Sequence, residues 1–326
     1  MISNENSPIQ YLDFEEPIKK IQDQIEEMQA MEKKSNIDLS DKINILKENL
    51  EAEKLNVTQG LTTWQKVQLS RHPNRPYALF YMDNITDFNI EIHGDRNVKD
   101  DKAIICKMAQ IDGKSVMLIG HQKGVNTKMR QYRNFGMPYP EGYRKALRAM
   151  KMAEKFNIPV VTLIDTPGAF PGIEAEDRGQ AEAIARNLFE MAQLKVPILC
   201  YIIGEGASGG ALGIGVGDRV FMLENTWFTV ISPESCSSIL WRSWEHKERA
   251  AEALKLTPAD NLKNKLIDGI VAEPAGGAHY NPCEMASRLR NHILENLNEL
   301  EKQTPDQRIS ARIDKYSAMS SAVEVG

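Results

Sequence analysis

Two glycine-rich segments place the strongest constraint on how this chain can fold. They are Asp165–Gly172 and Gly204–Ala211, and each follows an apolar run and precedes a run with helical periodicity. Glycine at a strand-to-helix turn lets backbone N–H groups approach a ligand without a Cβ in the way. The following helix adds unpaired donors and the positive end of its dipole. Each turn is therefore a candidate site for an anion or a developing oxyanion.

Short apolar runs recur along the chain from about residue 103. Those that predict strands are Ala103–Ile111, Val116–Gly120, Val160–Asp165, Ile198–Gly204, Val220–Leu223 and Phe228–Ile231. Helical patterns at Gly142–Phe156 and Glu174–Leu194 lie between them, and Asn281–Lys302 and Pro305–Ala318 predict closing helices. Strands that alternate with helices favour an α/β fold with crossover connections.

The first sixty residues have a different pattern. Between Pro17 and Lys54 the chain is polar, charged and free of glycine. Two apolar stripes repeat there at spacings of three and four: Ile18, Ile21, Ile25 and Met28, then Leu39, Ile43, Leu46 and Leu50. Ser35, Asn36 and Asp38 separate the stripes, as turn and N-cap residues do. We predict an antiparallel helical hairpin, which either binds a partner subunit or packs on its own body.

Composition argues against several classes of protein. Lys plus Arg number 40 and Asp plus Glu number 45, so the net charge of −5 carries no global signature for nucleic acid or anionic lipid. The cysteines form no C-x-x-C pair, which argues against a zinc ribbon and a disulfide framework. No apolar run is long enough to span a bilayer, and the acidic N-terminal stretch does not resemble a signal peptide. We expect a cytoplasmic protein with neither a membrane nor a nucleic acid as partner.

The glycine turns allow other interpretations. Gly204, Gly206 and Gly209 fit G-x-G-x-x-G, with Glu224 at the position of a ribose-binding acid, but later glycines interrupt the helix that a dinucleotide site needs. Asp165–Gly168 is similar to the D-x-x-G switch of GTPases, yet the sequence contains no G-x-x-x-x-G-K-[ST] loop. Both turns can also simply connect strands to helices.

Ten segments, taken in order, match a known family. They are Arg71–Pro73, Gly94–Arg96, Asp100–Ile104, Gly120–Gly124, Asn134–Pro138, Pro140–Arg148, Asp165–Gly172, Gly204–Ala211, Ile231–Glu234 and Gly276–His279. In them the chain resembles the carboxyltransferase alpha subunits of bacterial and plastid acetyl-CoA carboxylase, from about Leu12 to Asn281. The resemblance implies a crotonase-like fold, a right-handed spiral of ββα turns with an N-terminal helical hairpin. We expect the hairpin at 1–60, the crotonase-like core at 61–285, and C-terminal helices and a tail at 286–326.

The same resemblance implies that this chain is one of two kinds of subunit that form an enzyme together. Alpha subunits of this family act only in complex with a zinc-containing beta subunit, as an α2β2 heterotetramer. Together they transfer a carboxyl group from carboxybiotin to acetyl-CoA and form malonyl-CoA, the first committed step of fatty acid synthesis. Carboxybiotin arrives on the biotin carboxyl carrier protein, and ATP is consumed at the separate biotin carboxylase. No metal is expected on this subunit. The alternative is a crotonase-fold acyl-CoA enzyme that works alone.

Site residues follow from the resemblance as well. It places an oxyanion hole on the backbone N–H groups of Gly209, Gly210 and Ala211. The first turn would add a wall or a donor through Gly168, Ala169 and Gly172. Substrate contacts are expected at Gly206, Ala207, Ser208, Phe170, Lys123 and Arg144. Phe170 and Ala207 stand where the family pattern has tyrosine and glycine, and both keep their backbone N–H.

Side chains around the turns carry weaker signals. The basic stretch Lys123–Arg148 suits CoA phosphates or the biotin carboxylate, although such runs more often face water. The histidines lack i, i+4 spacing, which argues against a metal site. His121 and Glu205 are each open to a role in the site, Glu205 as a general base, or to a structural role. Ser208 has no evident histidine partner, which argues against a serine hydrolase.

Overall fold

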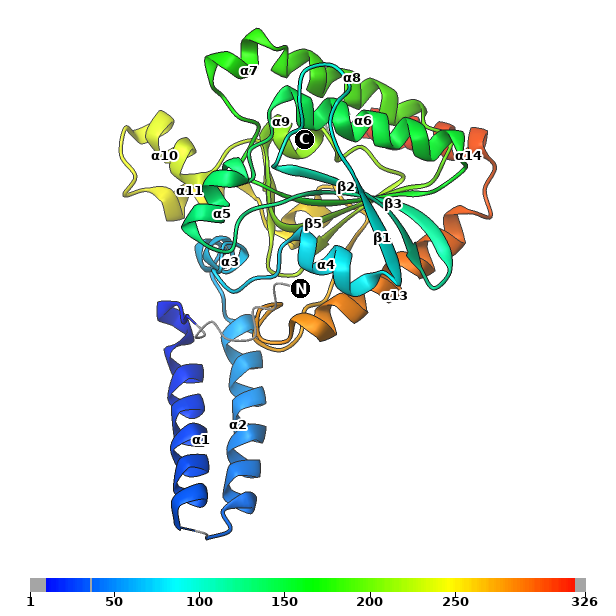
Figure 1. Cartoon of the computed structure of the whole chain (residues 1–326). Coiled ribbons are helices and arrows are strands. Elements are labelled where there is room, and N and C mark those ends of the chain that lie inside the picture. Colours follow the sequence, from blue (N-terminus) through cyan, green and yellow to red (C-terminus); the bar gives the residue numbers. More distant parts are fainter. Residues whose placement is uncertain (1–9, 36, 320–326) are drawn as a thin grey trace, which may run out of the picture.

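A single eight-stranded sheet with helices on both faces forms the centre of the computed structural model, which describes residues 10–35 and 37–319 (Figure 1). Its strands are β1 (Phe88–Ile92), β2 (Ile104–Ile111), β3 (Lys114–His121), β4 (Val160–Thr166), β5 (Ile198–Ala207), β6 (Arg219–Leu223), β7 (Trp227–Thr229) and β8 (Gly269–Val271). The order is β1-β2-β3-β4-β5-β6-β8, and β7 pairs with the end of β5. β1, β2 and β3 are antiparallel, and all later pairs are parallel.

The helices precede, cover and extend this sheet. They are α1 (Glu16–Ser35), α2 (Ser40–Gln59), α3 (Thr63–Ser70), α4 (Ala78–Ile85), α5 (Thr127–Tyr132), α6 (Pro140–Lys155), α7 (Ile173–Asp177), α8 (Gln180–Gln193), α9 (Ser208–Leu212), α10 (Pro233–Trp241), α11 (Lys247–Leu254), α12 (Pro258–Lys263), α13 (Pro282–Leu300) and α14 (Pro305–Ala318), with 3₁₀ turns η1 (Asp13–Glu15) and η2 (Asn134–Gly136). Among the described residues, no helix is both long and apolar enough to cross a membrane.

Two apolar clusters make the core, one on each face of the sheet. Helices α4 and α13 cover one face, and α6 and α8 cover the other. Side chains alternate along each strand, so Tyr201 and Ile203 of β5 pack on the first side while Cys200 and Ile202 pack on the second. A strand buried on both faces has no polar side, which explains why β4 and β5 appear in the sequence as continuous apolar runs.

The expected strands are present, with two additions. β1 is an edge strand of mixed polarity and β8 has only three residues, so neither produces a strong sequence pattern. The run expected at Phe228–Ile231 pairs only as far as Thr229, and Val230 beyond it is 73% exposed. The single helix expected at Glu174–Leu194 is two helices, because Gly179 between them takes a left-handed conformation (φ 84°) that breaks the helical hydrogen bonding.

The C-terminal helices expected at Asn281–Lys302 and Pro305–Ala318 are present as α13 and α14. The expected boundary at residue 285 falls inside α13. Met285, Leu289 and Ile293 of that helix are fully buried in the same cluster as the strands. Helix α13 therefore packs into the core. Periodicity shows that a helix has an apolar face but not what that face packs against.

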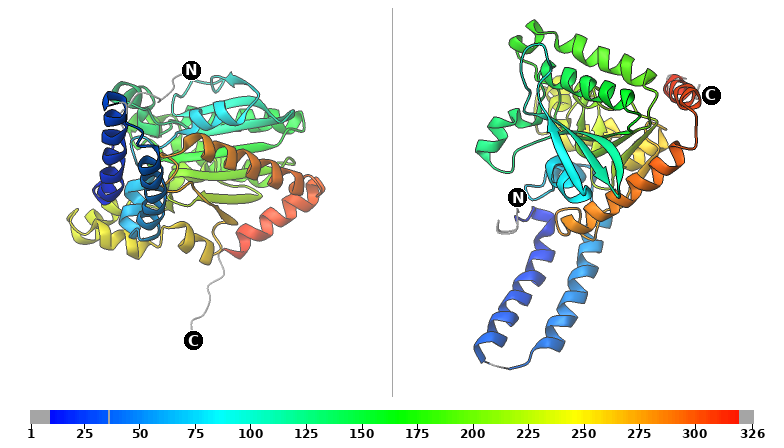
Figure 2. Two further views of the ribbon diagram at one scale, coloured as in Figure 1. Left: turned by 90° about the horizontal axis from the view of Figure 1, so that it is seen from below. Right: turned by 45° about the vertical axis from the view of Figure 1, so that its right-hand side comes forward.

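Helices α1 and α2 form the expected antiparallel hairpin, which projects away from the sheet (Figures 1 and 2). Ile18, Ile25, Ile43 and Leu50 are buried between the two helices. Of the expected turn residues, Asn36 lies outside the described residues. The Asp38 carboxylate accepts a hydrogen bond from the Ser40 N–H (3.0 Å), while Leu39 occupies the N-cap without a side-chain bond.

A buried polar cluster fixes the base of the hairpin to the core. Glu15 Oε1 lies 3.0 Å from His279 Nε2, and the His72 and His279 rings stack with centroids 3.9 Å apart. The three side chains bring potential metal-ligand atoms within 4.8 Å of one another. His72 Nδ1 accepts the Asn74 N–H, which leaves the proton on Nε2, where it is donated to the Gln10 carbonyl. This geometry favours a hydrogen-bonded cluster that joins the hairpin to the core over a metal site.

The hairpin should be stabilised mainly by the apolar contacts between α1 and α2. Ile43→Ala should destabilise it by about 2–5 kcal/mol, because truncation loses apolar burial and leaves a cavity. Ile43 is 5% exposed and Ile45 is 58% exposed, so Ile45→Ala is the matched control. Amide hydrogen exchange should quicken in α1 and α2 of the Ile43→Ala chain and stay unchanged in the strands. Equal effects of the two substitutions would contradict this account.

Candidate active site

The two glycine turns lie side by side because the strands that precede them are parallel neighbours. β4 pairs with β5 from Val160↔Ile198 onward, and the register shifts so that Thr166 lies beside Gly206. Parallel strands end at the same edge of a sheet, so the chain leaves both strands in one place. The structure thus brings together two segments that the sequence separates by about forty residues.

Contact between the turns is backbone to backbone. A Cβ on Gly210 would lie 2.5 Å from Gly168 C and 2.5 Å from Ala169 N, closer than real Cβ atoms come to backbone. Gly168 has φ 142°, a conformation that side chains disfavour. The two glycines therefore allow the second turn to pack directly on the first, which any side chain at 210 would prevent.

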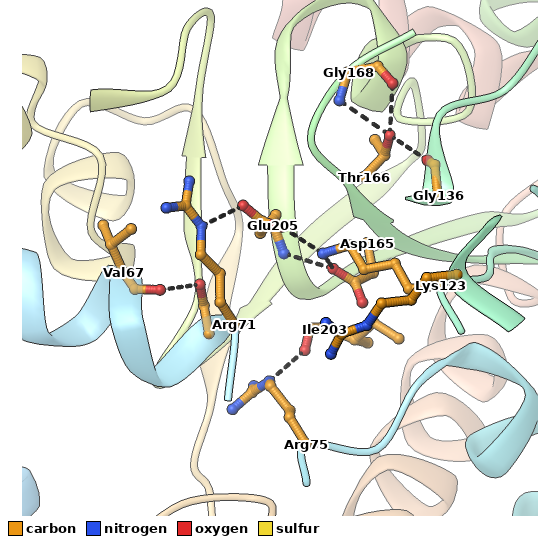
Figure 3. A network of polar contacts seen from close by, with 12 residues as sticks. Val67, Arg71, Arg75, Lys123, Gly136, Asp165, Thr166, Gly168, Ile203 and Glu205 are labelled. Carbon is orange, nitrogen blue, oxygen red and sulfur yellow. Dashed lines mark hydrogen bonds and ion pairs between the residues drawn. The ribbon is translucent and has the colours of Figure 1, made fainter. Parts of the chain in front are cut away.

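Side chains hold the first turn in shape. The Thr166 hydroxyl accepts the Gly168 N–H (3.1 Å) and lies 2.7 and 2.8 Å from the carbonyls of Gly136 and Gly168 (Figure 3). Phe170 donates its N–H to the Pro138 carbonyl, so that donor is not available to a substrate. Gly172 is the N-cap of α7, and the Phe170 ring fills the space its Cβ would need.

The second turn starts a short helix directly from the end of β5. Ala207 pairs with Thr229 of β7, and Ser208 then adopts a left-handed φ of 57° at the first position of α9. The first N–H groups of a helix have no partner within it. Gly209 is half-buried, whereas Gly210 and Ala211 are buried, so of the three expected donors the one on Gly209 is the most open to a ligand.

A chain of buried and partly buried ions joins the segments around the turns. Lys123 Nζ is 2.6 Å from Asp165 Oδ1 and 2.5 Å from Glu205 Oε2 (Figure 3). Arg71 Nε is 2.6 Å from Glu205 Oε1, and its Nη1 binds the Glu234 carboxylate of α10. Asp165 Oδ1 also accepts the Glu205 N–H (2.9 Å), so residues near the ends of β4 and β5 are joined through side chain and backbone.

These ions decide what Glu205 can do. Burial alone would raise its pKa, but the charges of Lys123 and Arg71 outweigh burial and bring the pKa of Glu205 to about 2. A carboxylate with such a low pKa is a weak general base near neutral pH. Of the two roles left open for Glu205 by the sequence, the geometry favours the structural one.

Lys123 and Arg144 were expected to contact substrate, and both are engaged within the chain. The Lys123 side chain is 12% exposed, and its ammonium contacts the two carboxylates described above. Arg144 donates to Asp95 (3.0 Å) and to the Arg178 carbonyl (2.9 Å). Contact of Lys123 or Arg144 with a substrate anion stays a prediction.

Arg71 and Arg75 both contact β5, and sequence reasoning gave neither side chain a role. Arg75, fully buried, donates to the Ile203 carbonyl (2.8 Å) and forms a bidentate pair with Glu273. Arg71 reaches Glu205 from the C-cap of α3. Arg71 and Glu234 lie in segments that match the family. The partner of Arg71, Glu205, is 134 residues away, and a contact over that separation has no local signal in the sequence.

The sequence as a whole matches the family described as acetyl co-enzyme A carboxylase carboxyltransferase-like, over residues 11–320. The chain belongs to this family. It is 61% identical over 312 residues to an acetyl-coenzyme A carboxylase carboxyl transferase subunit alpha of Flavobacterium psychrophilum, covering 95% of this chain and 98% of that protein. A subunit of the same description from Chlorobium limicola is 56% identical over 322 residues, covering 94% and 97%.

Solved structures of carboxyltransferases have the same fold at low identity. Transcarboxylase 12S matches with a TM-score of 0.56 and 18% identity, covering 68% of this chain and 41% of that chain. The beta subunit of geranyl-CoA carboxylase from P. aeruginosa matches with a TM-score of 0.54 and 19% identity, covering 74% and 46%. The chain thus spans less than half the length of these structural relatives. The expected crotonase-like fold is confirmed.

The contact of Gly210 with the first turn predicts that substitutions at Gly209 and Gly210 lower turnover by different amounts. Gly210→Ala should lower turnover of the assembled enzyme by about 10²-fold or more, because its Cβ pushes the donors away from the first turn. Gly209→Ala should cost far less, since its Cβ meets only the Ile184 side chain, at 3.7 Å, and the N–H remains. Steady-state rates of the two variants test this, and a Gly210→Ala enzyme with normal turnover would contradict the assigned geometry.

His121 should make stability fall at acid pH. Burial, together with the charge of Lys123, lowers the pKa of His121 to about 3 from 6.5, and the Gly210 backbone opposes the shift only partly. Between those values the unfolded chain binds the extra proton, so stability declines as pH falls from 6.5 toward 3. His121→Leu should flatten this decline by at most about 1.4 kcal/mol per pH unit.

Urea unfolding at pH 7.5 and pH 5 measures the effect. His93→Leu is the control, because the His93 side chain is 61% exposed. Neither ring nitrogen of His121 lies within full hydrogen-bonding distance of a partner among the described residues, and its interaction with the Gly210 backbone is weaker than that, so removing the imidazole breaks no full hydrogen bond. An unchanged pH dependence in His121→Leu would show that another group titrates.

Proposed function

We propose that this chain is the alpha half of a carboxyltransferase that moves a carboxyl group from carboxybiotin to acetyl-CoA, forming malonyl-CoA for fatty acid synthesis. Family membership over residues 11–320 supports the reaction class. The observation that carries the proposal within the structure is the contact of Gly210 with Gly168 and Ala169. It joins two glycine turns into one surface of backbone amides.

Backbone amides suit this reaction because its charges develop on oxygen. The bond between biotin N1 and the carboxyl group breaks, the biotin ring takes a proton from the acetyl methyl group, and the resulting enolate forms a carbon–carbon bond to the carboxyl carbon. Negative charge passes through the ureido oxygen and the thioester oxygen. In the proposed site the N–H groups of Gly209, Gly210 and Ala211 stabilise one of them, and the Gly168–Gly172 turn forms a second wall beside these donors.

Substrate would lie along the segment that leads into these donors. We place the biotin or acyl end beside Gly206, Ala207 and Ser208, with Phe170 across from them. Glu205 supplies no base in this scheme, since its pKa is about 2. The base is then the ureido group itself, and this chain's contribution is to position and stabilise.

The proposed site needs a partner to complete it. Ile173, which follows the first turn, and Val230, which follows β7, are 79% and 73% exposed. Ile239, Leu240 and Trp244, in and just after α10, are 70%, 62% and 69% exposed. Two cavities of about 410 Å³ lie beside α3, and neither is lined by a residue of the glycine turns. A beta subunit, zinc-containing as in the family, would cover these apolar side chains in an α2β2 assembly.

The remaining components follow from the same reaction. Carboxybiotin would be delivered on the biotin carboxyl carrier protein, and a separate biotin carboxylase would consume the ATP. We place no metal on this chain. The complex would work in the cytoplasm, and the hairpin α1–α2 is available to hold a partner.

The reverse reaction tests this proposal directly. Malonyl-CoA and biocytin would be mixed with this chain, with a beta subunit, and with both, and acetyl-CoA would be measured. Product from the mixture alone supports a site shared between subunits. Product from this chain alone would instead support an acyl-CoA enzyme that works by itself. A verified complex without activity would overturn the proposal.

A further inference from the structure

Lys123 connects the two strand ends from which the glycine turns start. It follows β3 by two residues, and its ammonium lies between Asp165 and Glu205. Asp165 is the first residue of the Asp165–Gly172 turn, and Glu205 is the second residue of the Gly204–Ala211 turn. One cation, from the loop after β3, thus contacts an acidic residue near the end of β4 and another near the end of β5 (Figure 3).

The surroundings of Lys123 leave little freedom for the two acids. A Cβ on Gly204 would lie 2.4 Å from Asp165 Oδ1, so the carboxylate occupies the space of an absent side chain. Asp165 and Glu205 are 2% and 6% exposed, and Glu205 donates its N–H to Asp165. Two buried carboxylates this close repel each other unless a cation lies between them.

The stem of Lys123 also packs against the support of the first turn. A Cβ on Gly136 would lie 2.7 Å from Lys123 Cγ, and Gly136 has φ 79°. The Gly136 carbonyl is 2.7 Å from the Thr166 hydroxyl, which in turn binds Gly168. Lys123 therefore contacts Asp165 through its charge, and through its methylene groups it packs on Gly136, whose carbonyl binds Thr166 of the first turn.

We propose that Lys123 is a positioning residue for carboxyl transfer, which holds the ends of β4 and β5 together so that the Gly210 and Gly168 turns keep their contact. The inference rests on the function proposed above. It replaces the expectation that Lys123 binds a substrate anion, because the ammonium is already paired with two carboxylates and its side chain is 12% exposed.

Lys123→Met tests the inference in the assembled enzyme. The variant keeps an apolar stem and removes the charge, so Asp165 and Glu205 should separate and shift the turns. A displacement of about 1 Å costs about 10²-fold in rate, and the loss should appear in kcat with KM for malonyl-CoA and biocytin changed less than about threefold. Lys107→Met is the matched control, since Lys107 is also buried and paired with an acid, Asp83, but lies away from the turns.

The double variant Lys123→Met/Asp165→Asn removes one charge of each sign and keeps an oxygen to accept the Glu205 N–H. It should recover at least about tenfold of the lost kcat, and it remains informative if Lys123→Met fails to fold. A KM raised more than about tenfold with normal kcat, in either variant, would overturn the inference and make Lys123 a substrate ligand. A double variant that folds but recovers nothing would overturn it as well.

Amide hydrogen exchange separates this inference from the proposed function. Residues 166–172 and 205–211 should exchange faster in Lys123→Met than in the wild-type chain, and Lys107→Met should leave them unchanged. This readout needs no turnover. A wild-type complex without activity would end the proposed function while leaving the exchange result valid, and unchanged exchange in Lys123→Met would reject the positioning role.

Discussion

Parallel pairing of β4 with β5 is the constraint on which the rest of the site depends. It delivers two glycine turns to one edge of the sheet and sets them in backbone contact at Gly210 and Gly168. Because both strands are buried on both faces, their position is fixed by the two apolar clusters around them. The amides of the turns are thus held at the ends of two fully buried strands, as a preorganised electrostatic site requires.

Buried charge is the second feature that shapes this edge. Lys123 and Arg71 face the three carboxylates of Asp165, Glu205 and Glu234, and the Arg75–Glu273 pair lies nearby. Removing ions from water is costly, and their attraction offsets this only when the geometry is close and further hydrogen bonds satisfy the remaining atoms. Here Asp165 also accepts a backbone N–H, and Arg75 also donates to a backbone carbonyl. The network therefore fixes backbone positions. A reaction that uses no side-chain base would still need these ions, because they hold the backbone of the turns in place.

The arrangement as a whole fits one half of an active site that two subunits share. The core is complete, with covered faces on both sides of the sheet, while the apolar side chains beside the turns and on α10 stay exposed. Arg71 connects that exposed region to the site, since it binds Glu205 on one side and Glu234 of α10 on the other. Docking of a partner on α10 and the position of the second turn would then be linked through one guanidinium group.

The sequence by itself determined the local features: the glycine turns, the main strands, the hairpin and, through ten ordered segments, the family. These are short-range properties, since each depends on the spacing of residues within one element or one turn. Only the tertiary structure decided that Lys123 meets Asp165 and Glu205, which lie 42 and 82 residues away, and that α13 belongs to the core. Periodicity identifies the apolar face of an element, whereas the choice of partner for that face, or for a buried charge, follows from how all the elements pack together.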